Sequence, residues 1–250
     1  MMFGKEKTTM PVGILTTKTV EGADQEGLVE RIGEHISKHN LNIFVGPEFL
    51  FMPKDRLYSK QEKDAIIQRL AEFTKDKEIL LIPGTIMWED EESFYNTAPV
   101  IANGKILGEY HKQTDGHSIK HAKKRGVTKE YHMGDRFGMY DWGDLKVGVE
   151  VCADYGNLRA EQPEGIDLYI IPSAGFDYGP FGGVMREGDE LRSPPISKRG
   201  YIFNADGRRG TSIVSPKYPD KMDPKGKDLE LDIYEIPGVR SKSMRTLFGR

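Results

Sequence analysis

The sequence has little of several features that define common classes of protein. A single cysteine among 250 residues leaves no partner for an internal disulfide framework and too few thiols for a cysteine-rich zinc site. No apolar run approaches the roughly 20 residues that span a bilayer, and the first residues lack the apolar stretch of a secretory signal. Because one cysteine fits a reducing compartment, we expect a cytoplasmic protein that does not act at a membrane.

The chain also lacks a strong excess of either charge. Its formal net charge is −3, with 30% charged and 37% hydrophobic residues, so it has no general attraction to nucleic acid or to anionic membranes. The length suffices for a buried core, and no repeat or linker divides the chain. We therefore predict a single domain over residues 1–250, with a core at about 12–216 and a C-terminal tail at 217–250.

Short apolar runs alternate with stretches whose apolar residues recur at helical spacing. Helices are predicted over residues 23–39 and 59–76, each with one apolar face. A long loop or short helix is predicted over 113–134, and a surface loop over 178–195. The predicted strands cover residues 12–17, 41–48, 78–89, 167–174, 201–207, 210–216 and 229–236.

Two β-hairpins are predicted in the middle of the chain. Residues 94–112 form two runs separated by Asn103 and Gly104, and Asn-Gly suits a tight turn. A second hairpin turns near Gly143 and Asp144 and continues into the apolar strand that precedes Cys152. The alternation of strands and helices is typical of a layered α/β fold, and the hairpins make its sheets mixed.

Three polar side chains stand at or just after the end of an apolar run. Glu48 follows IFVGP, Lys112 follows ILGEYH, and Cys152 follows LKVGVEV. Layered α/β folds place their sites at the edge where the strand ends open. We therefore predict that these residues, although distant in the sequence, share one site.

The three side chains have complementary chemistry. A thiol must lose its proton to attack a carbonyl or nitrile carbon. A carboxylate can accept that proton, and an ammonium group favours the thiolate and stabilises the charge that develops on the attacked group. The pattern alone leaves other interpretations open: Cys152 as a small buried hydrophobic residue, Glu48 as a solvated loop carboxylate, and Lys112 as one of many lysines.

A series of motifs around these residues resembles the nitrilase, or carbon–nitrogen hydrolase, superfamily. The motifs occur in the family's order and extend over roughly residues 12–216. They are GPEFLF around Glu48, LIPGTI, YNTAPVIANGKILGEYHK ending at Lys112, VGVEVCADYG around Cys152, IIPSA, and RGYIFNADG followed by GTSIVSP.

The resemblance implies a four-layer α-β-β-α sandwich with mixed β-sheets. It also implies a hydrolase that cleaves a non-peptide carbon–nitrogen bond of a small amide, carbamoyl compound or nitrile. Cys152 would carry the covalent intermediate, Glu48 would act as the base, and Lys112 would stabilise the tetrahedral intermediate together with the backbone N–H of Ala153. No metal or organic cofactor is implied, and such proteins usually assemble into homodimers or higher homo-oligomers.

The stretch after the nucleophile departs from the usual family pattern. It reads Tyr155-Gly156-Asn157-Leu158-Arg159 where many members have Arg-Phe-Pro-Glu. This difference concerns the substrate more than the chemistry. The substrate contacts expected from the family pattern are Ala153, Tyr155 and Phe176.

Many family members also carry a second glutamate in the site, between the lysine and the cysteine. Glu130, in TKEYHMGDRF, is the best candidate because MGD resembles a turn of the family. Glu150 is a weaker alternative: it lies two residues before Cys152, and alternate residues of a strand share a face. A structural carboxylate at the end of the strand is the competing interpretation of Glu150.

Two other groups of residues carry side chains capable of chemistry. His117 and His121 have the helical spacing of some zinc ligands, but no acidic third ligand stands at a recognised offset, so a solvated loop is the preferred interpretation. Lys120, Lys123, Lys124 and Arg125 form a basic cluster. A solvated face is expected there, with attraction of an anionic substrate as the alternative.

Three competing functions follow from the same residues. An acyl transferase would use the same triad and pass the acyl group from Cys152 to an amine. A non-catalytic binding or scaffold protein would keep the fold without turnover, although the intact triad argues against it. A cysteine peptidase would need a histidine partner, and no histidine stands in a recognisable motif for that role.

Overall fold

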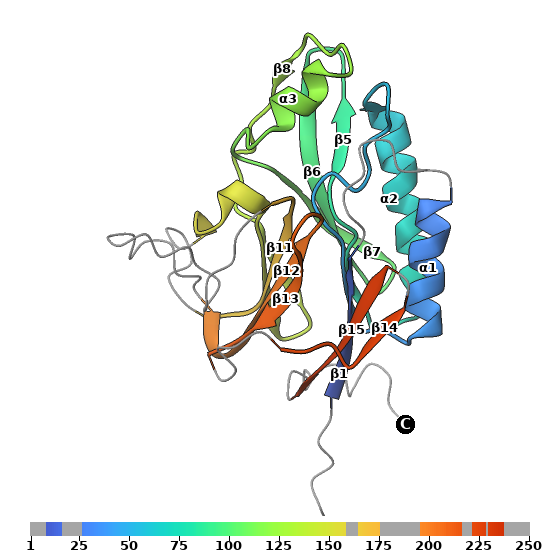
Figure 1. Cartoon of the computed structure of the whole chain (residues 1–250), viewed down its shortest axis with the longest axis vertical. Coiled ribbons are helices and arrows are strands. Elements are labelled where there is room, and N and C mark those ends of the chain that lie inside the picture. The colour runs from blue at the N-terminus through green and yellow to red at the C-terminus, as the bar shows by residue number, and fades with distance from the viewer. Residues whose placement is uncertain are drawn as a thin grey trace, which may run out of the picture.

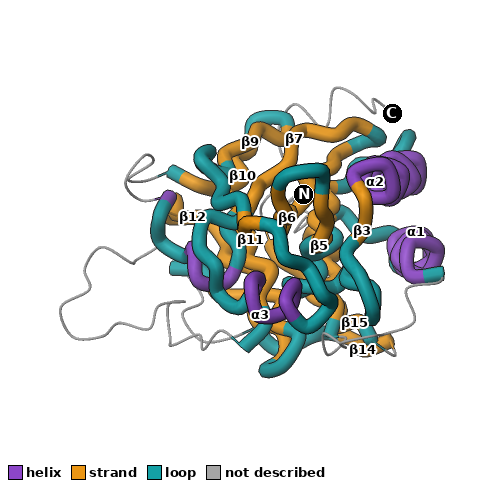
Figure 2. The backbone as a smooth tube through the Cα atoms, turned by 90° about the horizontal axis from the view of Figure 1, so that it is seen from above, coloured by secondary structure: helices purple, strands orange, loops and turns teal. Residues whose placement is uncertain are grey.

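The computed structural model describes residues 9–16, 27–158, 165–175, 196–216, 222–228 and 230–237. Their strands form two sheets that pack face to face, with two long helices on the outer face of the first sheet (Figures 1 and 2). No helix in these ranges is both long enough and apolar enough to cross a membrane.

Ten strands of the described chain form the first sheet. They run in the order β14–β15–β1–β2–β4–β6–β5–β3, and β7 and β8 also pair with β6. β1, β2 and β4 are parallel neighbours, whereas β15 runs antiparallel to β1, and β6 runs antiparallel to β4. The strands are β1 (Thr9–Leu15), β2 (Ile43–Val45), β3 (Tyr58–Ser59), β4 (Leu80–Ile82), β5 (Ile86–Glu89), β6 (Ser93–Ala102), β7 (Lys105–His111), β8 (Glu130–Tyr131), β14 (Gly226–Asp228) and β15 (Leu231–Pro237).

The second sheet has five strands in the order β13–β12–β11–β10–β9. Its three central strands are parallel, and the two edge strands are antiparallel to them. The mixed sheets predicted from the hairpins are therefore confirmed. The strands are β9 (Met139–Trp142), β10 (Leu145–Val149), β11 (Ile166–Ser173), β12 (Ile196–Asp206) and β13 (Gly210–Val214).

Helices α1 (Leu28–Lys38) and α2 (Lys60–Thr74) cover the outer face of the first sheet (Figure 1). Each buries one apolar stripe against the sheet, as the helical spacing predicted. The start of α2 is fixed by a capping box, in which the Ser59 hydroxyl accepts from the Glu62 N–H at 3.2 Å and the Glu62 carboxylate accepts from the Ser59 N–H at 2.8 Å.

The main hydrophobic core lies between the two sheets. Val12, Ile43 and Val45 enter it from the first sheet, and Val147 and Leu168 enter it from the second. All five are fully buried. Because the inner face of each sheet packs on the other sheet, the strands that carry the candidate site residues are held in fixed relative positions.

The outer face of the second sheet carries its own hydrophobic cluster, to which Tyr155 and Tyr169 belong. The connections on either side of β11 pass through residues 159–164 and 176–195, which lie outside the described residues. The surface loop predicted for 178–195 lies there as well.

The single strand predicted over residues 78–89 is wrong, because the segment forms two strands, β4 and β5. Pro83 and Gly84 separate them, and Gly84 has a φ of 102° that disfavours other residues. A Cβ at Gly84 would lie 2.3 Å from the carbonyl oxygen of Pro47. This break therefore lets the chain pass closely beside the segment that carries Glu48.

Both predicted hairpins are confirmed. Asn103 and Gly104 have φ values of 52° and 79°, as a tight type I′ turn between β6 and β7 requires. In the second hairpin Trp142 pairs with Leu145, which leaves two residues in the turn between β9 and β10. The first hairpin ends one residue before Lys112, and the second leads toward Cys152.

The chain returns to the core after residue 216. β15 pairs with β1 along seven positions, and its Tyr234 and Ile236 are buried between the sheets. The C-terminal segment therefore contributes structure to the first sheet beyond the core boundary expected from the sequence. In the charged region 113–134 the structure forms one short helix, α3 (Ser118–Lys123), and the two-residue strand β8.

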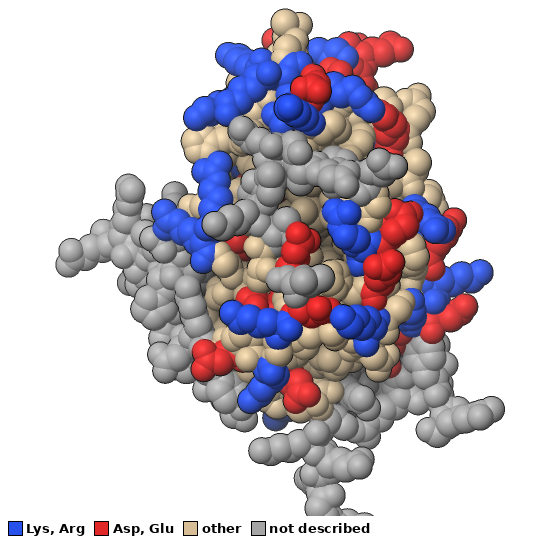
Figure 3. All heavy atoms as spheres, turned by 45° about the vertical axis from the view of Figure 1, so that its right-hand side comes forward, with Lys and Arg blue, Asp and Glu red and all other residues tan. Residues whose placement is uncertain are grey.

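Basic side chains are visible at the top of Figure 3, the end of the molecule at which α3 and β8 lie, with acidic side chains among them. Lys120, Lys123 and Lys124 are exposed there. Arg125 instead bonds to the backbone, because its Nε donates to the Pro53 carbonyl at 2.6 Å. This mixed and exposed surface fits a solvated face.

Candidate active site

Glu48 stands three residues after the end of β2. Its backbone N–H donates to the Ser173 carbonyl at 3.2 Å, which ties the end of β2 in the first sheet to the end of β11 in the second. Gly46 permits this path, because a Cβ there would lie 2.2 Å from the Pro83 carbonyl oxygen. The glutamate side chain points inward and is fully buried.

Lys112 follows β7 directly and is also fully buried. Its backbone N–H donates to the Asn96 carbonyl at 2.9 Å, which continues the pairing of β7 with β6. Its Nζ lies 2.6 Å from Oε1 of Glu48 and 5.8 Å from the centre of the Phe49 ring. The ammonium group is thus held against the carboxylate by a charge-assisted hydrogen bond.

Cys152 begins the short 3₁₀ turn η1 (Cys152–Asp154), after β10 has ended at Val149. Its φ is 50°, a left-handed conformation that is strained for a residue with a side chain. The turn directs the thiol toward Glu48, whose carboxylate interacts with it. The backbone N–H of Ala174 also reaches the sulfur. The structure therefore brings Glu48, Lys112 and Cys152 into one cluster, in which the two charged groups are fully buried and Cys152 is partly buried.

Burial and charge shift the pKa values of all three groups. Burial raises the pKa of the Cys152 thiol to about 12, and the Glu48 charge adds to this effect while Lys112 opposes it. Burial also raises the pKa of Glu48, against the opposing effect of Lys112. Burial alone would lower the pKa of Lys112, but the negative charges around it outweigh this effect and raise it. At neutral pH the thiol is therefore protonated and the lysine charged.

The carboxylate of Asp154 connects the two loops that carry Cys152 and Lys112. It accepts from the hydroxyl of Tyr110 and from the backbone N–H groups of Gln113 and Thr114, each at 2.8 Å. Asp154 is fully buried. The turn that carries Cys152 is thereby fixed to the chain that follows Lys112.

Two groups of the site were missed by sequence reasoning. The side-chain amide of Asn96 donates to Oε1 of Glu48 at 3.0 Å, so it orients the carboxylate together with Lys112. The backbone N–H of Ala174 acts on the thiol of Cys152, where it lowers the pKa and so favours the thiolate. Both residues lie within the quoted motifs YNTA and IIPSA, but nothing in their residue type indicates these contacts.

Ala153 is exposed and directly follows Cys152. Within the described ranges its N–H donates to no other residue. A free backbone N–H next to the sulfur is the type of donor that stabilises an oxyanion. Its position is compatible with the role expected from the family.

Glu130 is exposed on β8, where it pairs with Ser93 of β6. In the part of the chain that the structure describes, no hydrogen bond or ion pair joins it to the buried cluster. The adjacent Tyr131 approaches the site instead, because its hydroxyl donates to the Lys112 carbonyl at 2.9 Å. The strand alternation of β8 directs the tyrosine, not the glutamate, toward the lysine.

Glu150 does not share the face of Cys152. Its carboxylate accepts from the N–H groups of Gly156 at 2.6 Å and Leu158 at 2.5 Å, and from the Tyr169 hydroxyl. Burial raises its pKa to about 7. The expected alternation fails because the strand ends at Val149 and the left-handed Cys152 turns the chain. Glu150 thus anchors the turn that follows Cys152.

Tyr155 packs in the hydrophobic cluster on the outer face of the second sheet, with its ring centre 5.8 Å from that of Tyr169. Cys152 packs instead against the core between the sheets. The position of Tyr155 therefore does not support the substrate contact expected from the sequence. Phe176, the other expected aromatic contact, lies outside the described residues.

The spacing of His117 and His121 does not produce a metal site in the described chain. His121 is buried, with its ring centre 4.5 Å from that of Phe49. His117 is exposed and precedes α3 with a left-handed φ of 84°. The i,i+4 spacing that suggested zinc ligands therefore does not correspond to two residues on one helix face.

The fold and this cluster together define a class of protein. Two packed sheets bring a thiol, a carboxylate and an ammonium group to adjoining strand ends. A family model for carbon–nitrogen hydrolases matches residues 15–187. The chain belongs to the carbon–nitrogen hydrolase family.

Curated relatives agree with this assignment. The chain is 26% identical to omega-amidase NIT2 of Mus musculus over 205 residues, which are 77% of this chain and 73% of that protein. It is 28% identical over 122 residues to the glutamine-dependent NAD(+) synthetase of Thermotoga maritima. That second match covers 46% of this chain but only 20% of the synthetase.

Solved structures confirm the predicted α-β-β-α fold. Nit3 of Saccharomyces cerevisiae superposes with a TM-score of 0.64 at 18% identity, over 98% of this chain and 97% of that chain. An amidase from Nesterenkonia sp. superposes with a TM-score of 0.65 at 18% identity, over 98% of both chains.

Proposed function

We propose that this protein hydrolyses the carbon–nitrogen bond of a small amide through an acyl intermediate on Cys152. The observation that carries the proposal is the 2.6 Å contact between the Lys112 ammonium and Oε1 of Glu48, both fully buried beside the Cys152 thiol. Such a costly buried charge pair is hard to explain as a source of stability alone. The pair is well suited to catalysis, because Glu48 can accept a proton beside the fixed positive charge of Lys112.

The raised pKa of the thiol determines how the first step begins. With a pKa of about 12, Cys152 is a thiol and not a preformed thiolate at neutral pH. Glu48 accepts its proton as the sulfur attacks the amide carbon. Its second oxygen, Oε2, is buried and has no hydrogen-bond partner among the described residues, so it is available for that proton. The raised pKa of Glu48 makes it a stronger base for this step.

The tetrahedral intermediate carries a negative charge on the former carbonyl oxygen. Lys112 and the N–H of Ala153 stabilise that charge, a type of contribution worth about 10²–10³ in rate for one donor. Protonated Glu48 then gives its proton to the leaving nitrogen, the carbon–nitrogen bond breaks, and the acyl group remains on sulfur. Glu48 next accepts a proton from water as the water attacks the thioester. The carbon–sulfur bond then breaks, Glu48 returns the proton to the sulfur of Cys152, and the carboxylic acid leaves.

The amide is the preferred substrate class because of the relatives. The mouse relative is named an omega-amidase, and a structural neighbour is an amidase described with acrylamide and with the acetamide moiety of fluoroacetamide at its active-site cysteine. A panel of small primary amides, carbamoyl compounds and nitriles tests the proposal by ammonia release. We expect release from amides and none from Glu48→Gln. Equal release by the variant, or release from nitriles alone, would contradict the proposal.

Gly116 offers a test of the position of the lysine. A Cβ at Gly116 would lie 2.4 Å from Nζ of Lys112, so Gly116→Ala should displace the ammonium group. We expect kcat for amide hydrolysis to fall at least about tenfold, since one misplaced donor costs that much or more. The measurement is steady-state kinetics with the amide that the panel identifies.

Gly126→Ala is the matched control for this substitution. Gly126 also has a positive φ, of 76° against 40° at Gly116, but a Cβ added there would have no atom within 4 Å. Both variants bear backbone strain of about 1–2 kcal/mol, but only the alanine at position 116 contacts Lys112. Equal losses of kcat in the two variants would count against the assigned role of Lys112.

A further inference from the structure

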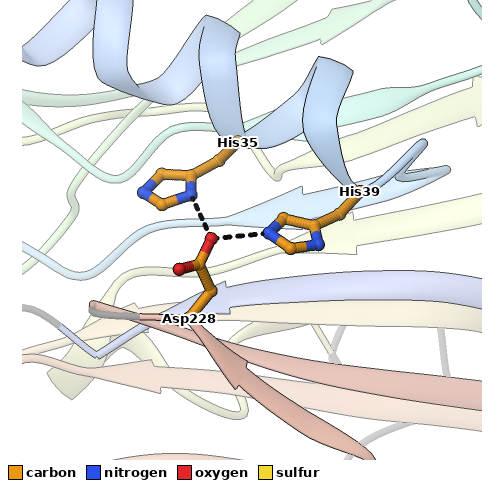
Figure 4. Close-up of side chains that lie close together, drawn as sticks. All are labelled: His35, His39 and Asp228. Carbon is orange, nitrogen blue, oxygen red and sulfur yellow. Dashed lines mark hydrogen bonds and ion pairs between the residues drawn. The ribbon is translucent and has the colours of Figure 1, made fainter.

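A second cluster of ionisable side chains lies away from the buried triad, between α1 and the C-terminal hairpin that β14 and β15 form. His35 and His39 stand four residues apart at the C-terminal end of α1, and Asp228 reaches them from β14 (Figure 4). Nε2 of His39 lies 2.7 Å and Nδ1 of His35 lies 3.8 Å from the same oxygen, Oδ2 of Asp228. The three side chains are only 12–19% exposed.

We propose that His35, His39 and Asp228 bind a divalent transition-metal ion, with zinc as the best match, and that the ion fastens the C-terminal hairpin to α1. One ligand atom from each residue lies within 4.8 Å of the others. Ligands at about 2.05 Å from a tetrahedral ion are roughly 3.3 Å apart. Small side-chain rotations therefore bring the present contacts of 2.7 and 3.8 Å to that geometry.

The donor set matches zinc better than it matches calcium or magnesium. Two imidazole nitrogens and one carboxylate oxygen are typical zinc ligands, whereas the harder ions prefer oxygen donors throughout. Neutral imidazole is the form that binds a metal, and the carboxylate of Asp228, within 3.8 Å of a nitrogen of each ring, supplies a negative charge at the site.

Lys38 shows that Asp228 attracts positive charge in the absence of an ion. Its Nζ lies 2.7 Å from the same Oδ2 atom, while its side chain is 64% exposed. Because an exposed lysine loses little on returning to water, an entering ion can displace it. The lysine nevertheless competes with the metal for the carboxylate, so removal of the lysine should tighten metal binding.

The proposed ion would join two elements of the fold, α1 and β14. α1 packs on the outer face of the first sheet, and among the described strands β14 pairs with β15 alone. An ion held by α1 and β14 would therefore strengthen the attachment of this edge strand to α1, which the contacts of Lys38 and His39 with Asp228 already make. Binding to the folded state alone raises the melting temperature by mass action.

The experiment measures binding of Zn²⁺ and Co²⁺ to the full chain in a Cys152→Ala background, which removes the single thiol as a competing ligand. Isothermal titration gives stoichiometry and affinity, and the visible spectrum of bound Co²⁺ reports its coordination. We expect one ion per chain, a four-coordinate cobalt spectrum and a higher Tm with Zn²⁺. His35→Ala, His39→Ala and Asp228→Asn should each weaken binding at least about tenfold.

Two further variants make the result specific. His132→Ala removes an exposed imidazole elsewhere and should leave the affinity unchanged. Lys38→Met removes the competing cation and should tighten binding about two- to fivefold. Binding that survives Asp228→Asn, or a loss in His132→Ala equal to that in His39→Ala, would overturn the proposal. An unchanged or weaker affinity in Lys38→Met would overturn the proposed competition and the site geometry with it.

Discussion

Cys152→Ala is expected to abolish amide hydrolysis while the protein remains folded. The alanine side chain keeps the backbone turn but cannot form the acyl intermediate, and loss of a covalent nucleophile typically lowers kcat by about 10⁴-fold or more. The packing change is small, because Cys152 is only partly buried and stands at the edge of the core. Ammonia release measures the activity, and thermal unfolding measures the fold.

Intact mass spectrometry provides the second measurement for this variant. Wild-type protein incubated with a slowly hydrolysed amide should gain the mass of one acyl group, and Cys152→Ala should gain none. Because the chain has one cysteine, a thiol adduct has a single possible site. Turnover by Cys152→Ala at about a tenth of the wild-type rate or above would exclude the sulfur as the nucleophile.

Lys112→Met is expected to damage both stability and catalysis. The substitution leaves the Glu48 carboxylate buried without its cation, and breaking a buried pair in this way costs about 3–5 kcal/mol. Loss of the oxyanion-stabilising charge should also lower kcat by about 10²–10³. Chemical denaturation measures the first effect, and steady-state kinetics the second.

A double variant separates the two effects. Lys112→Met with Glu48→Gln removes both charges, so we expect it to regain much of the lost stability while activity stays absent. Lys63→Met is the matched control, because Lys63 is also buried and paired, with Glu109 at 2.8 Å, but lies outside the site. It should lose stability and keep kcat. If Lys112→Met alone left the free energy of unfolding unchanged, Glu48 and Lys112 would not form a buried ion pair.

Local signals in the sequence were sufficient for most elements. The capping box at Ser59 and Glu62 set the start of α2, and Asn103-Gly104 set the turn between β6 and β7, because both act over three or four residues. The division of residues 78–89 into two strands was harder to predict. It depends on the approach of Gly84 to Pro47, a contact between segments far apart in the chain.

For the candidate site, too, local sequence signals identified some residues, whereas contacts between distant segments could not be predicted. Residue type and strand-end position singled out Glu48, Lys112 and Cys152, because their chemistry is complementary and each follows an apolar run. The supporting contacts of Asn96 and Ala174 were not predictable, since an amide and a backbone N–H carry no sequence signal for the partner that they meet. Glu150 was assigned the wrong face, because strand alternation holds only while the strand continues.

The sequence by itself determined the periodic elements, the tight turns and the identity of the reactive groups, because each of these depends on short-range sterics or on side-chain chemistry. Only the tertiary structure decided that Glu48 and Lys112 meet at 2.6 Å beside Cys152. It also decided that His35 and His39 meet Asp228, which lies 189 residues beyond His39 in the chain. Such meetings depend on how two sheets and a helix pack, and packing energy is a property of the assembled core that no local segment contains.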